Sequence, residues 1–199
     1  MTMIRCVSPV DGSVYAERLA LSLDEAKAVA ARARKAQKAW ARRPLDERIA
    51  LVLKGVARLN EMGQEVVTEL AWQMGRPIKY GGEFKGFNER SNYMASIAQE
   101  ALAPLVIEDS AAFKRFIARE PHGVVFVIAP WNYPYMTAIN SVAPALIAGN
   151  AVVLKHASQT LLTGERLARA FHEAGVPEEV FANVFLDHET SSRLIAEKQ

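Results

Sequence analysis

The sequence has little cysteine and histidine: Cys6 is its single cysteine, and it has four histidines among 199 residues. One cysteine excludes an intrachain disulfide framework and a cysteine-rich zinc site. The histidines form neither an HExxH pair nor a cluster at ligand spacing, so we expect no metal site. Such sparing use of cysteine is typical of a reducing compartment, and we expect a cytoplasmic location.

The chain also lacks long apolar runs and an excess of charge of one sign. Its start has no apolar signal-peptide core, and no apolar run approaches the length of a membrane span. The 24 Lys and Arg residues nearly balance the 22 Asp and Glu residues, which leaves a formal net charge of +2. We therefore expect neither nucleic acid nor a membrane surface as a partner. The hydrophobic fraction of 50% is that of an ordinary globular protein.

The first half of the chain is predicted to be helical. Ser22 and Glu25 form a capping-box pattern ahead of an alanine-rich stretch. Asp46 is expected to cap the second helix, and Gly75 has the position of a glycine that ends the third. The predicted helices cover residues 24–41, 46–63, 64–74 and about 80–102.

In the second half, predicted strands alternate with helices. Residues 113–119 partly alternate apolar and polar side chains, as an exposed or edge strand does. Residues 123–129 form a continuous β-branched and aromatic run, which predicts a parallel strand covered on both faces. Further strands are expected over 151–154 and 181–186, and helices over 135–148, 161–174 and from Asp187 onward. This alternation predicts an α/β fold with a doubly wound parallel sheet, whose ligand crevice lies at the carboxyl ends of the strands.

Two short segments are expected at that edge: PWNYP at residues 130–134 and KHASQT at residues 155–160. Neither contains the glycine-rich turn GxGxxG, which excludes a conventional Rossmann phosphate loop. The amide of Asn132 could donate to a developing oxyanion, although a turn asparagine can also merely cap backbone groups. The ammonium of Lys155 could donate to ribose or phosphate oxygens, although it could also lie in water at a strand end.

Three longer motifs share one register. They are PHGVVFVIAPWNYP at 121–134, PALIAGNAVVLK at 144–155 and AGVP at 174–177, with SPVDG at 8–12 upstream. In residues, order and spacing they resemble the N-terminal part of the NAD(P)-dependent aldehyde dehydrogenase superfamily. The resemblance implies an incomplete fold without the catalytic domain. It implies that residues 1–102 are the N-terminal segment and helices of the cofactor domain, 103–122 an arm resembling the oligomerisation segment, and 123–199 the first three strand–helix units of the sheet.

The resemblance also implies roles for individual residues. Asn132 would stabilise the oxyanion, and Lys155 would contact the adenosine ribose. Tyr133 and Thr137 would line a substrate passage, although both could equally be packing residues. Further cofactor contacts are implied for Ile128, Ala129, Pro130, Trp131 and Ser158.

Ser158 stands where the family usually has an acidic residue. A carboxylate there would repel the 2′-phosphate of NADP, whereas a neutral hydroxyl does not. We therefore expect the cofactor to be NAD or NADP, with NADP tolerated.

The implied activity is oxidation of an aldehyde to a carboxylic acid with NAD(P), by an enzyme that is a homo-oligomer in its full-length form. The nucleophilic cysteine and the basic glutamate of the family lie beyond the register at which this sequence ends, so we expect the chain alone to be inactive. Cys6 lies far upstream of the nucleophile's register. An alternative is a non-catalytic cofactor-binding or assembly subunit that pairs with a full-length homologue. An unrelated nucleotide-binding module would require all three motif registers to be coincidental.

Overall fold

A three-stranded parallel sheet lies at the centre of the molecule. A computed structural model describes residues 2–197 of the chain. The sheet has the order β5 (Val124–Ile128), β6 (Ala151–Lys155) and β7 (Phe181–Val184). Every residue of the middle strand β6 is buried. In register, Ile128 lies opposite Lys155, and Lys155 lies opposite Val184, so all three strands end at one edge.

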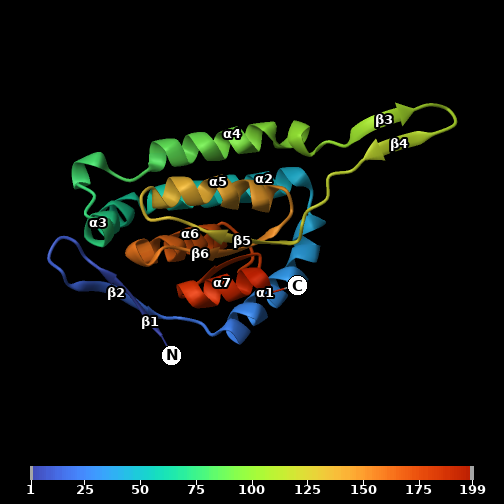
Figure 1. The fold of residues 1–199 in the computed structure, drawn as a ribbon. Helices are drawn as coiled ribbons and strands as arrows, with labels where there is room; N and C mark the ends of the chain where they lie inside the picture. The colour runs from blue at the N-terminus through green and yellow to red at the C-terminus, as the bar shows by residue number, and fades with distance from the viewer. Residues whose placement is uncertain (1, 198–199) are drawn as a thin grey trace.

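Helices cover both faces of this sheet (Figure 1). One face packs through Val152 and Leu154 against a layer that contains α2, α5 and α6, with α4 beyond α2 and α5. The other face packs through Ala151 and Val153 against α1 and α7. This arrangement confirms the expected α/β fold with a partial parallel sheet. The helices are α1 (Leu23–Ala41), α2 (Leu45–Glu61), α3 (Gly63–Met74), α4 (Phe84–Leu102), α5 (Pro134–Ile147), α6 (Leu161–Glu173) and α7 (His188–Ala196), with short 3-10 turns η1 (Ile78–Tyr80) and η2 (Ser158–Thr160).

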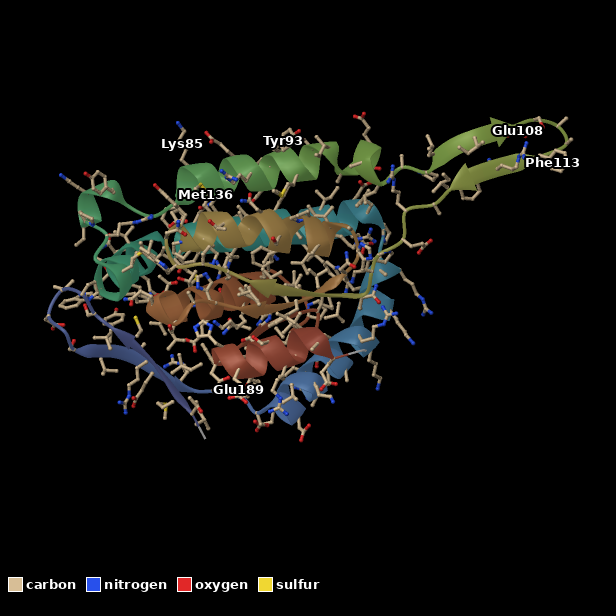
Figure 2. The ribbon with its side chains drawn as sticks, in the orientation of Figure 1. Lys85, Tyr93, Glu108, Phe113, Met136 and Glu189 are labelled. Carbon is tan, nitrogen blue, oxygen red and sulfur yellow. The ribbon has the colours of Figure 1, made fainter. Side chains whose placement is uncertain are left out.

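Two antiparallel hairpins lie outside the sheet. The N-terminal hairpin of β1 (Met3–Val7) and β2 (Val14–Leu19) was not predicted from the sequence. It packs through the buried Cys6 against the start of α6, and the Cys6 thiol donates to the carbonyl of Gln159 in η2 at 3.1 Å. The second hairpin, β3 (Leu105–Asp109) and β4 (Lys114–Ile117), projects away from the body, with Glu108 and Phe113 toward its far end (Figure 2).

Some local signals for helix ends were correct and one was wrong. Both hydrogen bonds of the Ser22–Glu25 capping box are present. Gly75 ends α3 in the left-handed conformation, with φ of 73°. The expected cap at Asp46 was wrong: α2 begins at Leu45 directly after Pro44, and the Asp46 carboxylate instead accepts a hydrogen bond from Gln99 of α4. The fourth helix begins at Phe84 rather than Tyr80, because η1 and a glycine pair precede it.

Two strand predictions also need correction. The strand expected at residues 113–119 is β4, which covers only Lys114–Ile117. All of its residues are exposed, as expected for an exposed or edge strand. Strand β5 is not covered on both faces: Val124 to Phe126 are half-buried and Ile128 is 50% exposed. The reason is its place in the sheet, since β5 lies at an edge and its side chains line an open cavity.

Gly55 allows α2 and α6 to pack closely, and a substitution at this position tests that packing. A Cβ at Gly55 would lie 2.8 Å from the ring of the buried Phe171. Gly55→Ala should therefore lower the free energy of unfolding by about 1–3 kcal/mol through overpacking, although alanine favours a helix by about 1 kcal/mol. Urea unfolding measures the change.

Gly63→Ala is the matched control, because a Cβ there would lie 3.7 Å from Phe84, an ordinary contact. It should be neutral or stabilising. Equal stability changes in the two variants would contradict the close packing at Gly55.

Candidate functional site

The carboxyl edge of the sheet brings together the two segments predicted to carry function. The chain leaves β5 through residues 129–134 and leaves β6 through residues 156–160. The backbone N–H of Ala129 donates to the carbonyl of Lys155 at 3.0 Å, so the two segments start side by side. Strand β7 ends at the same edge, and Asp187 follows it. The edge is thus formed by three strand ends, as a crevice in an open α/β sheet requires.

Asn132 lies on the exposed turn between β5 and α5. Its backbone carbonyl accepts a hydrogen bond from Nη2 of Arg76 at 3.3 Å. Its side-chain amide makes none of the hydrogen bonds found among residues 2–197. Because the residue is exposed and its amide has no partner in this range, both amide donors are available to a ligand, and the side chain does not cap backbone groups there.

Lys155 ends the central strand, and its side chain is largely buried, with 7% of the residue exposed. Burial lowers the pKa of its ammonium, and the Asp187 carboxylate acts in the opposite direction. Asp187 itself caps α7 by accepting from the N–H of Thr190 at 2.7 Å, and these hydrogen bonds lower the pKa of its carboxyl. A desolvated ammonium gains strongly from new acceptors, so this position suits a ligand with hydroxyl or phosphate oxygens. Asp187 was expected to open a helix, and its effect on Lys155 was not foreseen.

The other predicted cofactor residues are spread over the same edge. Ala129 is buried, whereas Pro130 and Trp131 are exposed on the turn that leads to Asn132. Ser158 is exposed at the start of η2. Ile128 alone among these residues lines a cavity of about 570 Å³, which runs along β5 between α1 and α7. Among the predicted site residues, this cavity therefore adjoins Ile128 only.

A smaller cavity of about 330 Å³ adjoins the Asn132 turn on the side of α4. It is lined by Tyr133 and Met136 from α5 and its N-cap, and by residues near the starts of η1 and α4 that include Arg76 and Glu83. Met136, in the first turn of α5, lies against Gly86 of α4 (Figure 2). Thr137, predicted beside Tyr133, is half-buried and is not part of this lining.

His156 joins the two segments of the edge. Its Nδ1 accepts hydrogen bonds from the Ala157 N–H at 2.9 Å and from the Thr160 hydroxyl at 3.0 Å. The proton must then lie on Nε2, which donates to the carbonyl of Pro134 at 3.2 Å. Burial lowers the pKa of His156 to about 4, which keeps the ring neutral. No role was predicted for His156, although its place within the KHASQT segment was a usable signal.

Residues 2–197 contain neither a metal-binding cluster nor a membrane-spanning helix. No group of three or more His, Cys, Asp or Glu side chains there could hold a metal ion. None of the helices in that range is both long and apolar enough to cross a membrane.

Comparison with known sequences places this geometry in context. The profile of the Aldehyde dehydrogenase family matches residues 1–199. A vanillin dehydrogenase of Corynebacterium glutamicum is 37% identical over 180 residues, which are 89% of this chain and 37% of that protein. A benzaldehyde dehydrogenase [NAD(+)] of Pseudomonas putida is 35% identical over 87% of this chain and 36% of its own length. A succinate-semialdehyde dehydrogenase [NADP(+)] of Deinococcus radiodurans is 30% identical over 90% and 38%.

Solved structures show the same relationship. An NAD-dependent benzaldehyde dehydrogenase from Corynebacterium glutamicum superposes with a TM-score of 0.90 at 32% identity, over 98% of this chain and 43% of that chain. PnpE in complex with nicotinamide adenine dinucleotide gives a TM-score of 0.90 at 31% identity, over 99% and 41%. The chain spans less than half the length of these relatives.

The bridging histidine makes stability depend on pH. The folded protein keeps His156 neutral down to about pH 4, whereas in the unfolded chain it takes up a proton near pH 6.5. The neutral ring's contribution to the free energy of unfolding is therefore fully present above pH 6.5. As the pH falls from 6.5 toward 4, the free energy of unfolding decreases by at most about 3 kcal/mol. His156→Gln should lose less stability than the wild type between pH 7 and 4.5, as measured by urea unfolding.

His122→Gln is the matched control, because His122 is exposed. It should follow the wild-type pH dependence. An unchanged pH dependence in His156→Gln would show that the buried ring does not cause the loss.

Proposed function

Since the chain belongs to the aldehyde dehydrogenase family, we propose that it forms the cofactor-binding part of an NAD(P)-dependent enzyme that oxidises an aldehyde to a carboxylic acid. The observation that carries the proposal is the juxtaposition at one sheet edge of an exposed amide, Asn132, and a buried ammonium, Lys155. The relatives are named for vanillin, benzaldehyde and succinate semialdehyde, which share only the aldehyde group. The substrate class is accordingly an aldehyde.

The residues at the edge fit a dinucleotide. The desolvated Lys155 ammonium would donate to the adenosine ribose, and the Ser158 hydroxyl lies in the neighbouring turn η2. Ile128, Ala129, Pro130 and Trp131 would form the side of the groove along which the cofactor lies. Bound there, NAD(P) supplies the hydride acceptor of the oxidation. Because Ser158 carries no charge, both NAD and NADP are accommodated in this proposal.

Asn132 would stabilise the charge that develops on the aldehyde oxygen when a nucleophile adds to its carbon. An amide donates hydrogen bonds without ionising, so its donors are present at every working pH. In a full-length enzyme the thiolate nucleophile and the glutamate that activates water would come from outside these 199 residues. Cys6 does not replace that nucleophile, because it is buried and burial raises the pKa of its thiol.

The remaining parts of the chain have supporting roles in the proposal. Residues 1–102 and 123–199 belong to the cofactor domain, and Tyr133 and Thr137 border the substrate passage. Residues 103–122 form the arm through which a homo-oligomer assembles, because Ile107, Phe113 and Phe116 present apolar side chains to solvent. The free thiol of Cys6 suits the reducing cytoplasm, which remains our expected location.

The oxyanion role of Asn132 can be tested in the full-length enzyme. Asn132→Ala should lower kcat about 10²–10³-fold, the usual loss for one oxyanion donor. The KM for NAD(P) should stay within about twofold, because the amide is not proposed to hold the cofactor in the ground state. Steady-state production of NAD(P)H measures both values.

The 199-residue chain alone is the control, and it should form no NAD(P)H from an aldehyde. Turnover by the purified chain would contradict the placement of the nucleophile outside it. Copurification of the chain with a full-length homologue, without any change in turnover, would favour the assembly-subunit alternative. An unchanged kcat in Asn132→Ala would remove this residue from the chemistry.

Cofactor choice provides a separate test at Ser158. Ser158→Glu should weaken NADP binding about tenfold or more by repulsion of the 2′-phosphate, with a much smaller effect on NAD. Isothermal titration with each cofactor in the full-length enzyme measures the two affinities. Ser158→Gln is the matched control, because it adds similar bulk without charge. If the glutamate and glutamine variants bind NADP equally, charge at this position does not select the cofactor.

A further inference from the structure

A buried ion pair lies beside the Asn132 turn. Arg76 follows Gly75 at the end of α3, and Glu83 immediately precedes α4. Nη1 of Arg76 lies 2.9 Å from Oε1 of Glu83, and the two side chains are only 13% and 3% exposed. Burial raises the pKa of the Glu83 carboxyl, while the Met136 N–H and the Arg76 guanidinium oppose that rise. Burying two charges is costly, so the pair is expected to make further contacts that offset the cost.

Those further contacts fall on one five-residue segment, 132–136. Oε2 of Glu83 accepts from the backbone N–H of Met136 at 2.7 Å. Nη2 of Arg76 donates to the backbone carbonyl of Asn132 at 3.3 Å. The Arg76 guanidinium also lies over the ring of Tyr133, 5.3 Å from its centroid. One ion pair thus contacts the residue that bears the proposed oxyanion donor, the N-cap of α5 and the first turn of α5.

The start of α5 has no cap of its own. Tyr133 occupies the N-cap position and makes no side-chain capping bond, and Pro134 at the first helical position has no N–H. The N–H of Met136 therefore depends on the Glu83 carboxylate, which also favours the positive end of the helix dipole. The helix that begins two residues after Asn132 is fixed in place by a carboxylate from another element.

We propose that Arg76 and Glu83 are positioning residues, which hold the 132–136 turn so that the Asn132 amide points at the reacting oxygen. The proposal rests on the proposed function for the role of Asn132. Arg76 fixes the carbonyl side of Asn132, and Glu83 fixes the helix start on the other side of the turn. The direction of the carboxamide follows from these two attachments, and a displacement near 1 Å is enough to cost about 100-fold in rate.

A different role for the pair would be to stabilise the fold without directing catalysis. The chain offers a comparison in the more exposed ion pair of Arg18 and Glu165, which joins β2 to α6. This pair is bidentate, through Nε and Nη2 of Arg18, with 2.9 Å between Nη2 and Oε2 of Glu165. Its hydrogen bonds do not involve residues 132–136. Removing it should lower Tm without disturbing the Asn132 turn.

The experiment uses the full-length enzyme with the variants Arg76→Met, Arg76→Lys, Glu83→Gln and Arg18→Met. Arg76→Met should lower kcat about tenfold or more while the KM for NAD(P) stays within about twofold, because misdirected donors act on the transition state. Arg76→Lys should recover part of kcat, since its ammonium pairs with Glu83 but lacks the fork that also reaches Asn132. Glu83→Gln should lose less than Arg76→Met, because its amide oxygen can still accept from Met136.

Hydrogen exchange measured by mass spectrometry gives a readout that is independent of turnover. Peptides covering residues 132–137 should exchange faster in Arg76→Met and Glu83→Gln, and at the wild-type rate in Arg18→Met. Equal losses of kcat in Arg76→Met and Arg18→Met at equal Tm, or an unchanged kcat in Arg76→Met, would overturn the proposal. If the wild-type enzyme oxidises no aldehyde, the proposed function fails, and the exchange data still decide whether the pair holds the turn.

Discussion

The complete burial of strand β6 is the constraint on which the rest of the structure depends. Both neighbouring strands take their register from it, and helices from both layers pack on its two faces. Five buried residues in a row leave the last of them, Lys155, with a charged head at the boundary between core and solvent. The strand therefore sets the position of the ammonium, and parallel pairing sets the position of the turn that carries Asn132 beside it.

Several features encoded within a few residues were predictable from the sequence, although the cap expected at Asp46 was not formed. The Ser22–Glu25 capping box, the left-handed Gly75 and the buried run of β6 each have a local physical cause, and all were located correctly. The N-terminal hairpin was missed because its strands are short and mostly exposed, with Cys6 as the fully buried residue of β1. Its pairing follows from contacts made across the chain rather than from a periodic pattern.

In the candidate site, too, residues near strand ends were predictable from the sequence, whereas residues that reach the site through tertiary packing were not. Motif register named Asn132, Lys155 and Ser158 as candidates, and their place at one edge of the sheet was predictable because they lie at or after the ends of strands whose apolar character is evident. It did not indicate Arg76 or Glu83, which lie outside the motifs and reach the turn only through the packing of α3 and α4. The apolar sequence of β5 also led to the wrong prediction that both of its faces are buried. The run at 124–128 is apolar on both faces, yet among residues 2–197 its outer edge has no partner strand.

The hydrogen bond between Cys6 and Gln159 joins groups 153 residues apart in sequence. During synthesis, the N-terminal hairpin emerges first but cannot meet its partner in η2 until that later segment has left the ribosome. At about 5–20 residues per second, this delay is roughly 8–30 seconds. For that interval the thiol has no such partner, so the N-terminal hairpin gains this contact only once the segment after β6 has emerged.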